Sequence, residues 1–213
     1  MLSTNWPLFD LKITTPVLEI RVPRDEDLDK LLLVTDEGIH DRASMPFLNP
    51  WTDLDPNTRR QTSLQWWWGQ RARWSVDNWS LTGAVFVNDE LIGVQDLAAE
   101  NFAVLRSVTT GSWLGQKFQG RGYGKEMRQA ILHLAFEGLD AVEAHSGAFW
   151  DNAASLGTSR SLGYQDNGTH LTLRRGQPDR QQLLVLTRDQ WLTRRRSDIT
   201  ISGLENALSM FVG

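Results

Sequence analysis

The sequence predicts an α+β domain in which a mixed, mostly antiparallel sheet is flanked by helices. Two apolar stretches, at 81–87 and 91–97, flank a short polar turn, which is typical of a β-hairpin. Amphipathic helical patterns lie before and after this group of strands. A glycine-rich stretch at 120–124 then joins a strand to a further helix. This order of elements is that of a mixed α+β sheet.

The first third of the chain predicts one strand and two helices. Residues 17–22 alternate between apolar and polar side chains and end at Pro23, as a strand does. Asp25 can cap a helix that ends near Gly38. Residues 39–57 contain three prolines and several large apolar side chains, which indicates a long, ordered connection. A second helix is expected over residues 57–74.

Three consecutive tryptophans lie on this second helix. Consecutive residues on a helix point in different directions, so at least one of Trp66, Trp67 and Trp68 must face a pocket, a partner or the surface. The simpler interpretation is that the rings pack on the sheet. The sequence leaves both interpretations open.

The remaining elements follow from the same patterns. A strand at 105–114 leads into the glycine-rich stretch, and the helix after it ends at Gly138 and has its apolar stripe at Met127, Ala130, Ile131 and Leu134. The later elements are a strand at 141–146, a helix at 151–162, strands at about 164–174 and 181–187 separated by a turn at 176–179, and a short helix at 187–191. The tail alternates through 198–202, which makes an extra strand plausible. Residues 1–213 are expected to form a single domain with a core at about 17–191 and a C-terminal tail extension at 197–213.

Composition excludes several classes of protein. The chain has 213 residues, 40% of them hydrophobic, and no apolar run long enough to span a membrane. Its first seven residues lack the pattern of a secretory signal, and a cytoplasmic protein is expected. The absence of cysteine excludes disulfides, thiolate metal ligands and a cysteine nucleophile. A net charge of −4 does not favour nucleic-acid binding and suits a cationic acceptor such as an amine.

The glycine-rich stretch predicts an anion site. Gly120, Gly122 and Gly124 leave room for a phosphate, and the N-terminus of the following helix adds free N–H groups and partial positive charge. Arg121, Lys125 and Arg128 are expected to add mobile positive charge around the turn. The spacing fits neither the dinucleotide fingerprint nor the Walker loop, since Lys125 is followed by Glu126.

The pattern that remains is Gln119-x-x-Gly122-x-Gly124, which resembles the signature of the GNAT acyltransferase superfamily. The preceding Ser-Trp-Leu-Gly at 112–115 is similar to the branch that includes the ribosomal-protein N-terminal acetyltransferases. The resemblance covers about residues 17–191 and implies the mixed sheet that the residue patterns predict. It implies that backbone N–H groups hold the pyrophosphate of coenzyme A, at Gln119, Gly120, Arg121, Gly122, Tyr123 and Gly124, with Lys125 as a charge partner.

The resemblance also assigns roles to the strand before the loop. Its end is expected to pair with the pantetheine amides through Trp113 and Leu114, with Gly115 as a further candidate. The Leu114 N–H is expected to polarise the thioester carbonyl. A second segment, Asn152-x-x-Ser155 followed by Leu162-Gly163-Tyr164, resembles another family motif. Asn152 is then a candidate contact to the cofactor arm and Ser155 a candidate acid for the departing thiolate.

Both candidates on this second segment have a structural alternative. Asn152 could simply cap a helix, as could Asp151. The Ser155 hydroxyl could be buried and bonded to the preceding helical turn. Tyr164 is expected in the core.

No residue stands out as the general base. Asp96 and His145 are candidates, with a chain of water molecules as the remaining option. The resemblance implies an acceptor pocket between the first two helices and the later strands. Such a pocket would be lined by residues 40–57, the tryptophan run and the strand before the loop. We therefore expect acceptor contacts from Trp51, Trp67 and Ser112.

The sequence thus predicts an N-acyltransferase that moves an acetyl group from acetyl-coenzyme A to a primary amine, directly and without a metal. The acceptor could be a small molecule, a protein N-terminus or a lysine. Succinyl-coenzyme A is an alternative donor, because the likeness includes actinobacterial members thought to use it. A non-catalytic coenzyme-A-binding regulatory module and an interaction protein using its tryptophans are alternatives from other classes. The tail and the aromatic residues suggest a homodimer or higher homo-oligomer, and no membrane or nucleic-acid partner is expected.

Overall fold

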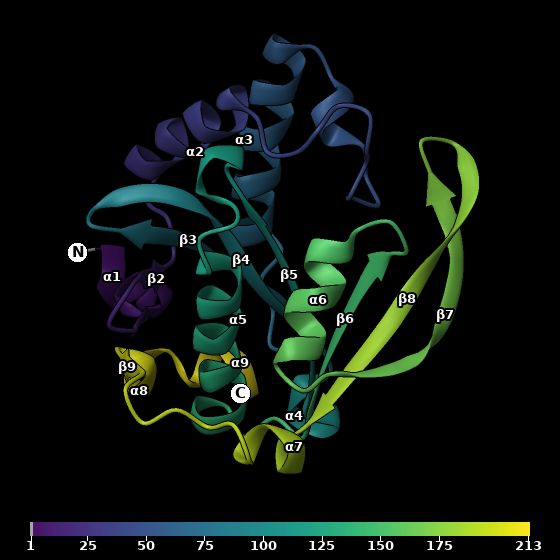
Figure 1. The fold of residues 1–213 in the computed structure, drawn as a ribbon. Coiled ribbons are helices and arrows are strands. Elements are labelled where there is room, and N and C mark those ends of the chain that lie inside the picture. Colours follow the sequence, from purple (N-terminus) through teal and green to yellow (C-terminus); the bar gives the residue numbers. More distant parts are fainter. Residues whose placement is uncertain (1) are drawn as a thin grey trace.

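The computed structural model describes residues 2–213 and is built around one nine-stranded sheet (Figure 1). The strand order is β7-β8-β6-β5-β4-β3-β2-β1-β9. The strands are β1 (Lys12–Thr14), β2 (Glu19–Arg21), β3 (Asn78–Val87), β4 (Glu90–Glu100), β5 (Ser107–Leu114), β6 (Glu143–Phe149), β7 (Gln165–Arg174), β8 (Gln177–Thr187) and β9 (Thr200–Ser202). Within the described residues, β5 and β6 are the parallel pair and the other neighbours are antiparallel. This is the predicted mixed, mostly antiparallel sheet.

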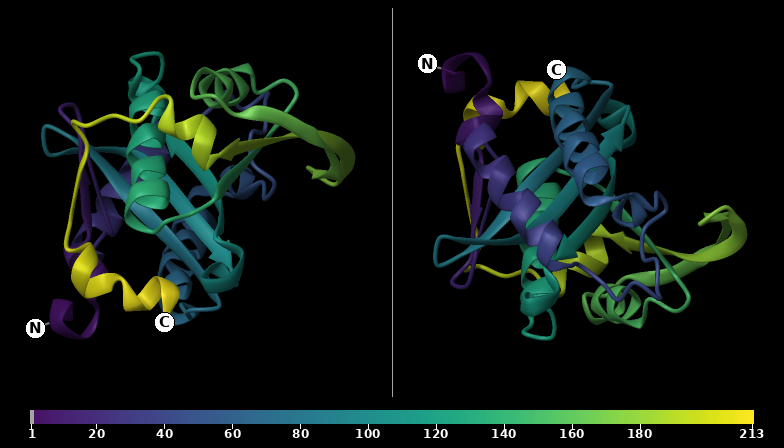
Figure 2. Two further views of the ribbon diagram at one scale, coloured as in Figure 1. Left: turned by 90° about the horizontal axis from the view of Figure 1, so that it is seen from below. Right: turned by 90° about the horizontal axis from the view of Figure 1, so that it is seen from above.

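Helices cover both faces of the sheet (Figure 2). On one face, α2 (Asp25–Glu37) and α3 (Pro56–Ala72) enclose a small apolar cluster with strands β3 and β4. On the other face, α5 (Tyr123–His133) packs into the larger core, and α6 (Ala153–Ser161) lies beside it. The shorter elements are α1 (Leu2–Asn5), η1 (Pro7–Asp10), η2 (Trp51–Asp53), α4 (Phe102–Leu105), η3 (Gln116–Phe118), η4 (Leu134–Gly138), α7 (Arg188–Leu192), α8 (Leu204–Ala207) and α9 (Ser209–Val212).

Several boundaries differ from the sequence-based expectation; β6, expected at 141–146, covers Glu143–Phe149. Strand β5 starts at Ser107 because residues 102–105 form a helical turn, which ends at Arg106 with a left-handed φ of 51°. Strand β8 starts at Gln177, so the expected turn at 176–179 is wrong. The hairpin instead turns through Arg175 and Gly176, whose φ values of 50° and 77° match the twist of the flanking strands. Strand β1 was not expected at all, because residues 12–14 show no clear strand pattern in the sequence.

The C-terminal tail packs on the rest of the chain. Strand β9 pairs with β1, with Ile201 opposite Ile13, and so covers that edge of the sheet. Phe211 is fully buried and its carbonyl accepts a hydrogen bond from Trp79 Nε1 at 3.3 Å. The Met210 carbonyl accepts one from Trp74 Nε1 at 3.0 Å. The hydrophobic core therefore extends beyond residues 17–191 and includes the tail.

Strands β5 and β6 separate after a short parallel stretch. They pair over Ser107–Thr109 and Glu143–His145, and Thr110 Oγ1 donates to the His145 carbonyl at 3.1 Å. Beyond this point β5 continues along β4 and β6 continues along β8, so the two strands diverge in Figure 1. One edge of β5 is consequently left without a strand partner between Gly111 and Leu114. We call this the free edge of β5.

Candidate functional site

The glycine-rich loop forms an open cradle at the N-terminus of α5. Gly120 and Gly122 have φ values of 73° and 85°, and a Cβ atom added at either would meet nothing within 4 Å. Within residues 2–213, the backbone N–H groups from Gly120 to Gly124 have no hydrogen-bond partner. Open space, free donors and the positive end of a helix suit a phosphate group.

The Gln119 side chain holds this loop in place. Its Nε2 atom donates to the Leu114 carbonyl at 2.9 Å and to the Ile39 carbonyl at 2.6 Å. These bonds tie the loop to the end of β5 and to the end of α2. The sequence motif placed Gln119 among the phosphate-binding backbone groups, and this anchoring role of its side chain was missed. Its own N–H is already bonded to the Gln116 carbonyl.

The three basic residues near the loop lie in two different environments. Arg121 and Lys125 are exposed and form no ion pair within the described chain, which leaves them free for phosphates. Arg128 is 3% exposed and points away from the loop. Its Nη1 atom donates to Ser146 Oγ at 3.2 Å and its Nη2 atom to Ser112 Oγ at 3.1 Å. The expectation that Arg128 adds mobile charge at the loop is therefore wrong, because burial fixes its side chain between two strands.

The free edge of β5 presents the backbone groups of alternate residues. The Gly115 N–H donates to the Ile92 carbonyl at 2.9 Å, which makes this pair and the pair Trp113–Val94 hydrogen-bonded pairs of the antiparallel ladder. The backbone groups of Leu114 and Ser112 consequently point away from β4, into the space between β5 and β6. The Leu114 N–H thus faces the free edge of β5, whereas the backbone groups of Trp113 and Gly115 face β4.

Asn152 and Ser155 lie at the start of α6. Asn152 caps the helix, because its Oδ1 atom accepts from the Ser155 N–H at 3.1 Å. The neighbouring Asp151 instead pairs with Arg174 at 2.9 Å. Ser155 is half-buried, and its hydroxyl makes no hydrogen bond within residues 2–213. The alternative of a hydroxyl bonded to the preceding helical turn therefore does not hold for Ser155.

The two candidate bases differ in their surroundings. The Oδ1 atom of Asp96 is buried and has no hydrogen-bond partner in the described chain. Burial raises the pKa of this carboxyl to about 7, against the opposing effects of Thr82 and the Arg128 charge. His145 is only partly buried and its Nε2 atom lies 2.8 Å from Glu143 Oε1. Strand alternation directs Asp96 and His145 to the face of the sheet that carries α2 and α3.

An aromatic row lies on the same face. The Phe47 ring is 5.6 Å from His40 and 5.5 Å from Trp51, and Trp51 is 6.3 Å from Trp113, between ring centroids. All four residues are partly exposed. The row connects the loop between α2 and α3 to the end of β5. We call it the aromatic row.

The other expected acceptor contacts lie elsewhere. Trp67 is 7% exposed and packs in the cluster enclosed by α2 and α3, while Trp66 and Trp68 are exposed. Ser112 points to the α5 face of the sheet, where its hydroxyl contacts Arg128. Of the three residues expected to bind the acceptor, only Trp51 joins the aromatic row.

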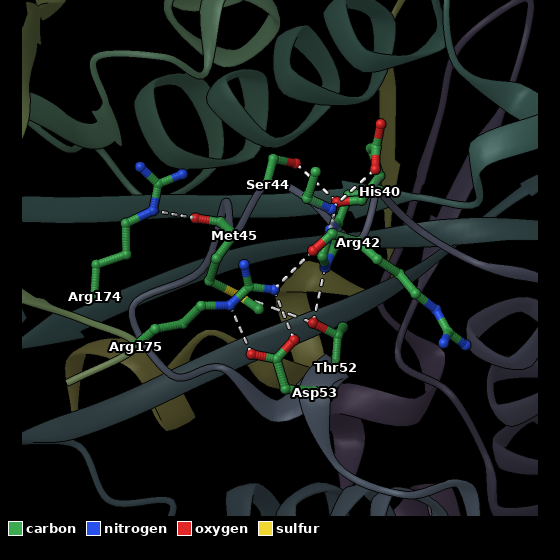
Figure 3. A network of polar contacts seen from close by, with 10 residues as sticks. His40, Arg42, Ser44, Met45, Thr52, Asp53, Arg174 and Arg175 are labelled. Atoms are coloured by element: carbon green, nitrogen blue, oxygen red, sulfur yellow. Dashed lines mark hydrogen bonds and ion pairs between the residues drawn. The ribbon is translucent and has the colours of Figure 1, made fainter. Parts of the chain in front are cut away.

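Contacts between distant segments join the β7–β8 hairpin to the loop between α2 and α3, as Figure 3 shows. Arg175, at the turn between β7 and β8, makes two bonds to the Asp53 carboxylate, at 2.7 and 2.8 Å, and one to the Arg42 carbonyl at 3.0 Å. Arg174 Nε donates to the Met45 carbonyl at 2.8 Å. The sequence did not predict this arrangement. We call these contacts the hairpin clamp.

The described residues show neither a metal-binding cluster nor a membrane-spanning helix. Side chains that could ligate a metal ion are not gathered into any group of three or more in the described part. Among the helices of this part, none has the length and hydropathy needed to cross a membrane.

Comparison with known proteins gives one family and one fold. A family model described as an acetyltransferase (GNAT) domain matches residues 18–165. The structure is similar to Mycobacterium smegmatis RimJ in complex with a coenzyme A disulfide, with a TM-score of 0.71 and 16% identity over 95% of each chain. It is also similar to RimL, described as a ribosomal L7/L12 alpha-N-protein acetyltransferase, with a TM-score of 0.64 and 17% identity over 81% of this chain and 95% of that one. A structure described as a GNAT-family acetyltransferase from Bacillus anthracis has a TM-score of 0.62 and 12% identity, over 84% of this chain and 99% of that one. At these identities, the solved structures show a shared fold.

Proposed function

Because this chain belongs to the GNAT acetyltransferase family, we propose that it transfers an acetyl group from acetyl-coenzyme A directly to a primary amine. The observation that carries the proposal is the alignment of two sets of free backbone donors. One set is the cradle from Gly120 to Gly124, and the other is the free edge of β5 that ends at Leu114. Gln119 joins the two by bonding to the Leu114 carbonyl.

The residues present fit the coenzyme A thioester. The cradle would hold the pyrophosphate, with Arg121 and Lys125 as charge partners. The backbone of Ser112 and Leu114 would pair with the amide groups of the pantetheine arm, as an added strand does. Asn152, although it caps α6, keeps its amide nitrogen for the same arm.

The thioester of the donor supplies an activated acyl carbon. The chemical step needs three further groups, and each has a candidate in this chain. The Leu114 N–H would stabilise the negative charge that develops on the carbonyl oxygen. Asp96 would accept the proton of the attacking amine, directly or through water, since its pKa near 7 is suited to a general base. As the C–N bond forms and the C–S bond breaks, the Ser155 hydroxyl would supply a proton to the sulfur. His145 is the second candidate base, and its contact with Glu143 makes it the less available of the two.

The aromatic row and the hairpin clamp would form the acceptor site. Indole and phenyl faces attract ammonium groups and cover apolar side chains. One similar structure is described as acting on the α-amino group of a ribosomal protein, which supports a protein N-terminus as acceptor. A small amine is the other option, and a peptide series ending in different residues separates the two.

Binding and turnover together test this proposal. Calorimetry with coenzyme A and acetyl-coenzyme A should show micromolar affinity, and thiol release should depend on an added amine. Binding without turnover on any amine would support the non-catalytic module, and no binding would favour an interaction protein. Light scattering at micromolar concentration tests the expected homodimer, with a monomeric mass rejecting it. Succinyl-coenzyme A belongs in the same panel, because the sequence leaves it open as the alternative donor.

A further inference from the structure

Arg174 contacts three separate segments of the chain, one through each nitrogen of its guanidinium group. The Nε atom donates to the Met45 carbonyl at 2.8 Å, in the loop between α2 and α3 (Figure 3). The Nη1 atom donates to Asp179 of β8 at 3.1 Å, and the Nη2 atom forms an ion pair with Asp151 at 2.9 Å. Asp151 lies just before α6. The hairpin, the loop and the start of α6 therefore meet at one side chain.

The guanidinium group of Arg174 is held in one orientation. Its side chain is 16% exposed, and its central carbon lies 4.4 Å from the centre of the Phe149 ring, which is fully buried at the end of β6. A planar group that stacks on a ring and uses every nitrogen cannot turn without breaking several contacts at once. Within the described chain, the neighbouring Arg175 bonds to Asp53 and Arg42 of the loop and makes no bond to α6. The link to α6 thus distinguishes Arg174 from the rest of the hairpin clamp.

The segments that meet at this side chain belong to opposite sides of the proposed reaction. Asp151 is followed by Asn152, whose Oδ1 atom accepts from the Ser155 N–H at 3.1 Å, and these two residues are the candidates for contact with the donor. Met45 is 1% exposed and lies two residues before Phe47 of the aromatic row, on the acceptor side. One guanidinium group therefore joins the acceptor loop to the residues that would contact the donor.

We propose that Arg174 is a positioning residue that couples the binding of the acceptor to the binding of coenzyme A. The inference rests on the proposed function and goes beyond it, since Arg174 need touch neither ligand. An acceptor that orders the loop at Met45 would stabilise, through Arg174, one position of Asp151 and of the start of α6. Coenzyme A bound against Asn152 would stabilise the same position from the other side. Such coupling is reciprocal, so each ligand raises the affinity for the other by the same factor.

A ternary complex that cannot react measures this coupling factor. Free coenzyme A carries no acyl group, so calorimetry can follow the binding of an acceptor in its presence and in its absence. The acceptor probe is the peptide or small amine that gives the highest kcat/KM with acetyl-coenzyme A. In the wild-type protein, saturating coenzyme A should tighten the binding of this probe about five- to tenfold, toward the lower end of the usual range for coupled sites.

Asp151 and Asp179 provide a matched pair of variants. Both are solvent-accessible carboxylates in contact with the same guanidinium group, at 2.9 and 3.1 Å, but Asp151 leads to α6 whereas Asp179 lies within the hairpin. Asp151→Asn should reduce the coupling factor below about twofold, and Asp179→Asn should keep the wild-type value. Arg174→Lys keeps the charge without the planar fork, so it should lose most of the coupling. If Arg174→Lys does not fold, the two aspartate variants still decide.

Three results would overturn the inference. The first is a wild-type protein that binds the acceptor probe equally well with and without coenzyme A. The second is a coupling factor that persists in Asp151→Asn. The third is an equal loss in Asp151→Asn and Asp179→Asn, which would assign the effect to the charge around Arg174 and not to the link with α6. In each case coenzyme A binding and amine-dependent thiol release would still support the proposed function. A wild-type protein that binds no coenzyme A, or acts on no amine, would reject both.

Discussion

The donor cradle and the hairpin clamp are built in opposite ways. The cradle is five consecutive residues whose backbone N–H groups are free, and its glycines leave it open. The clamp joins Arg175 to Asp53, which are 122 positions apart in the sequence, through side chains. Backbone donors at a helix N-terminus recognise any phosphate, whatever the acceptor. We infer that the cradle binds the phosphate groups that all coenzyme A donors share. The clamp region, by contrast, would distinguish one acceptor from another.

The largest effect is expected from blocking the cradle. Gly122→Trp should abolish measurable coenzyme A binding, because the new side chain projects into the space that the phosphate needs. Gly122 has a φ of 85°, so strain of about 1–2 kcal/mol is also expected. Gly168→Trp is the matched control: its φ is 83°, an added Cβ meets nothing within 4 Å, and it lies on β7. Equal loss of binding in both variants would mean that strain, not blockage, is responsible.

The second largest effect is expected at Asp96, on the acceptor side. Asp96→Asn should lower kcat by about 10²–10³, the usual contribution of a general base, with coenzyme A affinity unchanged. In the wild type, kcat/KM should rise with pH up to about 7, as this carboxyl loses its proton, and the variant should lack that rise. A variant with the wild-type pH profile would assign the base to His145 or to water.

Asp96→Asn should also change the stability of the protein, and the change should depend on pH. The pKa of Asp96 is about 7 in the folded chain, above the ordinary value of 3.8. Between these two values the folded state binds more protons than the unfolded state, so the stability of the wild type falls as pH rises from about 4 to 7. Asn carries no such charge. The melting temperature of Asp96→Asn should therefore exceed that of the wild type at pH 8, and converge toward it or fall below it at pH 4.

The contrast between cradle and clamp also explains what could be predicted from the sequence. The cradle is encoded by a contiguous motif, so Gln119, Gly122 and Gly124 indicated both the fold and the donor site. Arg128 belongs to the same helix, but its burial depends on where β5 and β6 diverge, and no local pattern contains that. Arg175 lay between the strand expected at 164–174 and the turn expected at 176–179, and its partner Asp53 lay in the long connection expected at 39–57. Side chains that meet across more than a hundred residues leave no periodic signal.

A smaller effect is expected at Ser155, where donor and acceptor would meet. Ser155→Ala should lower kcat about tenfold, since a thiolate leaves readily and needs less help from an acid than an alkoxide does. The hydroxyl makes no bond in the described chain, so its removal should leave the melting temperature within about 2 °C of the wild type. Ser161→Ala is the control on the same helix, because that hydroxyl is exposed and bonds locally to Thr158. A kcat equal in both variants would remove Ser155 from the mechanism.

The smallest effect is expected from opening the clamp. Arg175→Met removes the two bonds to Asp53 and the one to the Arg42 carbonyl. Because this ion pair is well exposed, its loss should leave the unfolding free energy nearly unchanged. The KM for the acceptor should rise severalfold, because the segment that carries Phe47 and Trp51 loses its attachment to the hairpin, while coenzyme A affinity stays constant. Arg160→Met removes a similar exposed pair, with Asp166, that lies outside the clamp, and should change neither constant. A KM unchanged in Arg175→Met would mean that the aromatic row keeps its position without the clamp, and that residues 39–57 form the acceptor site by their own packing.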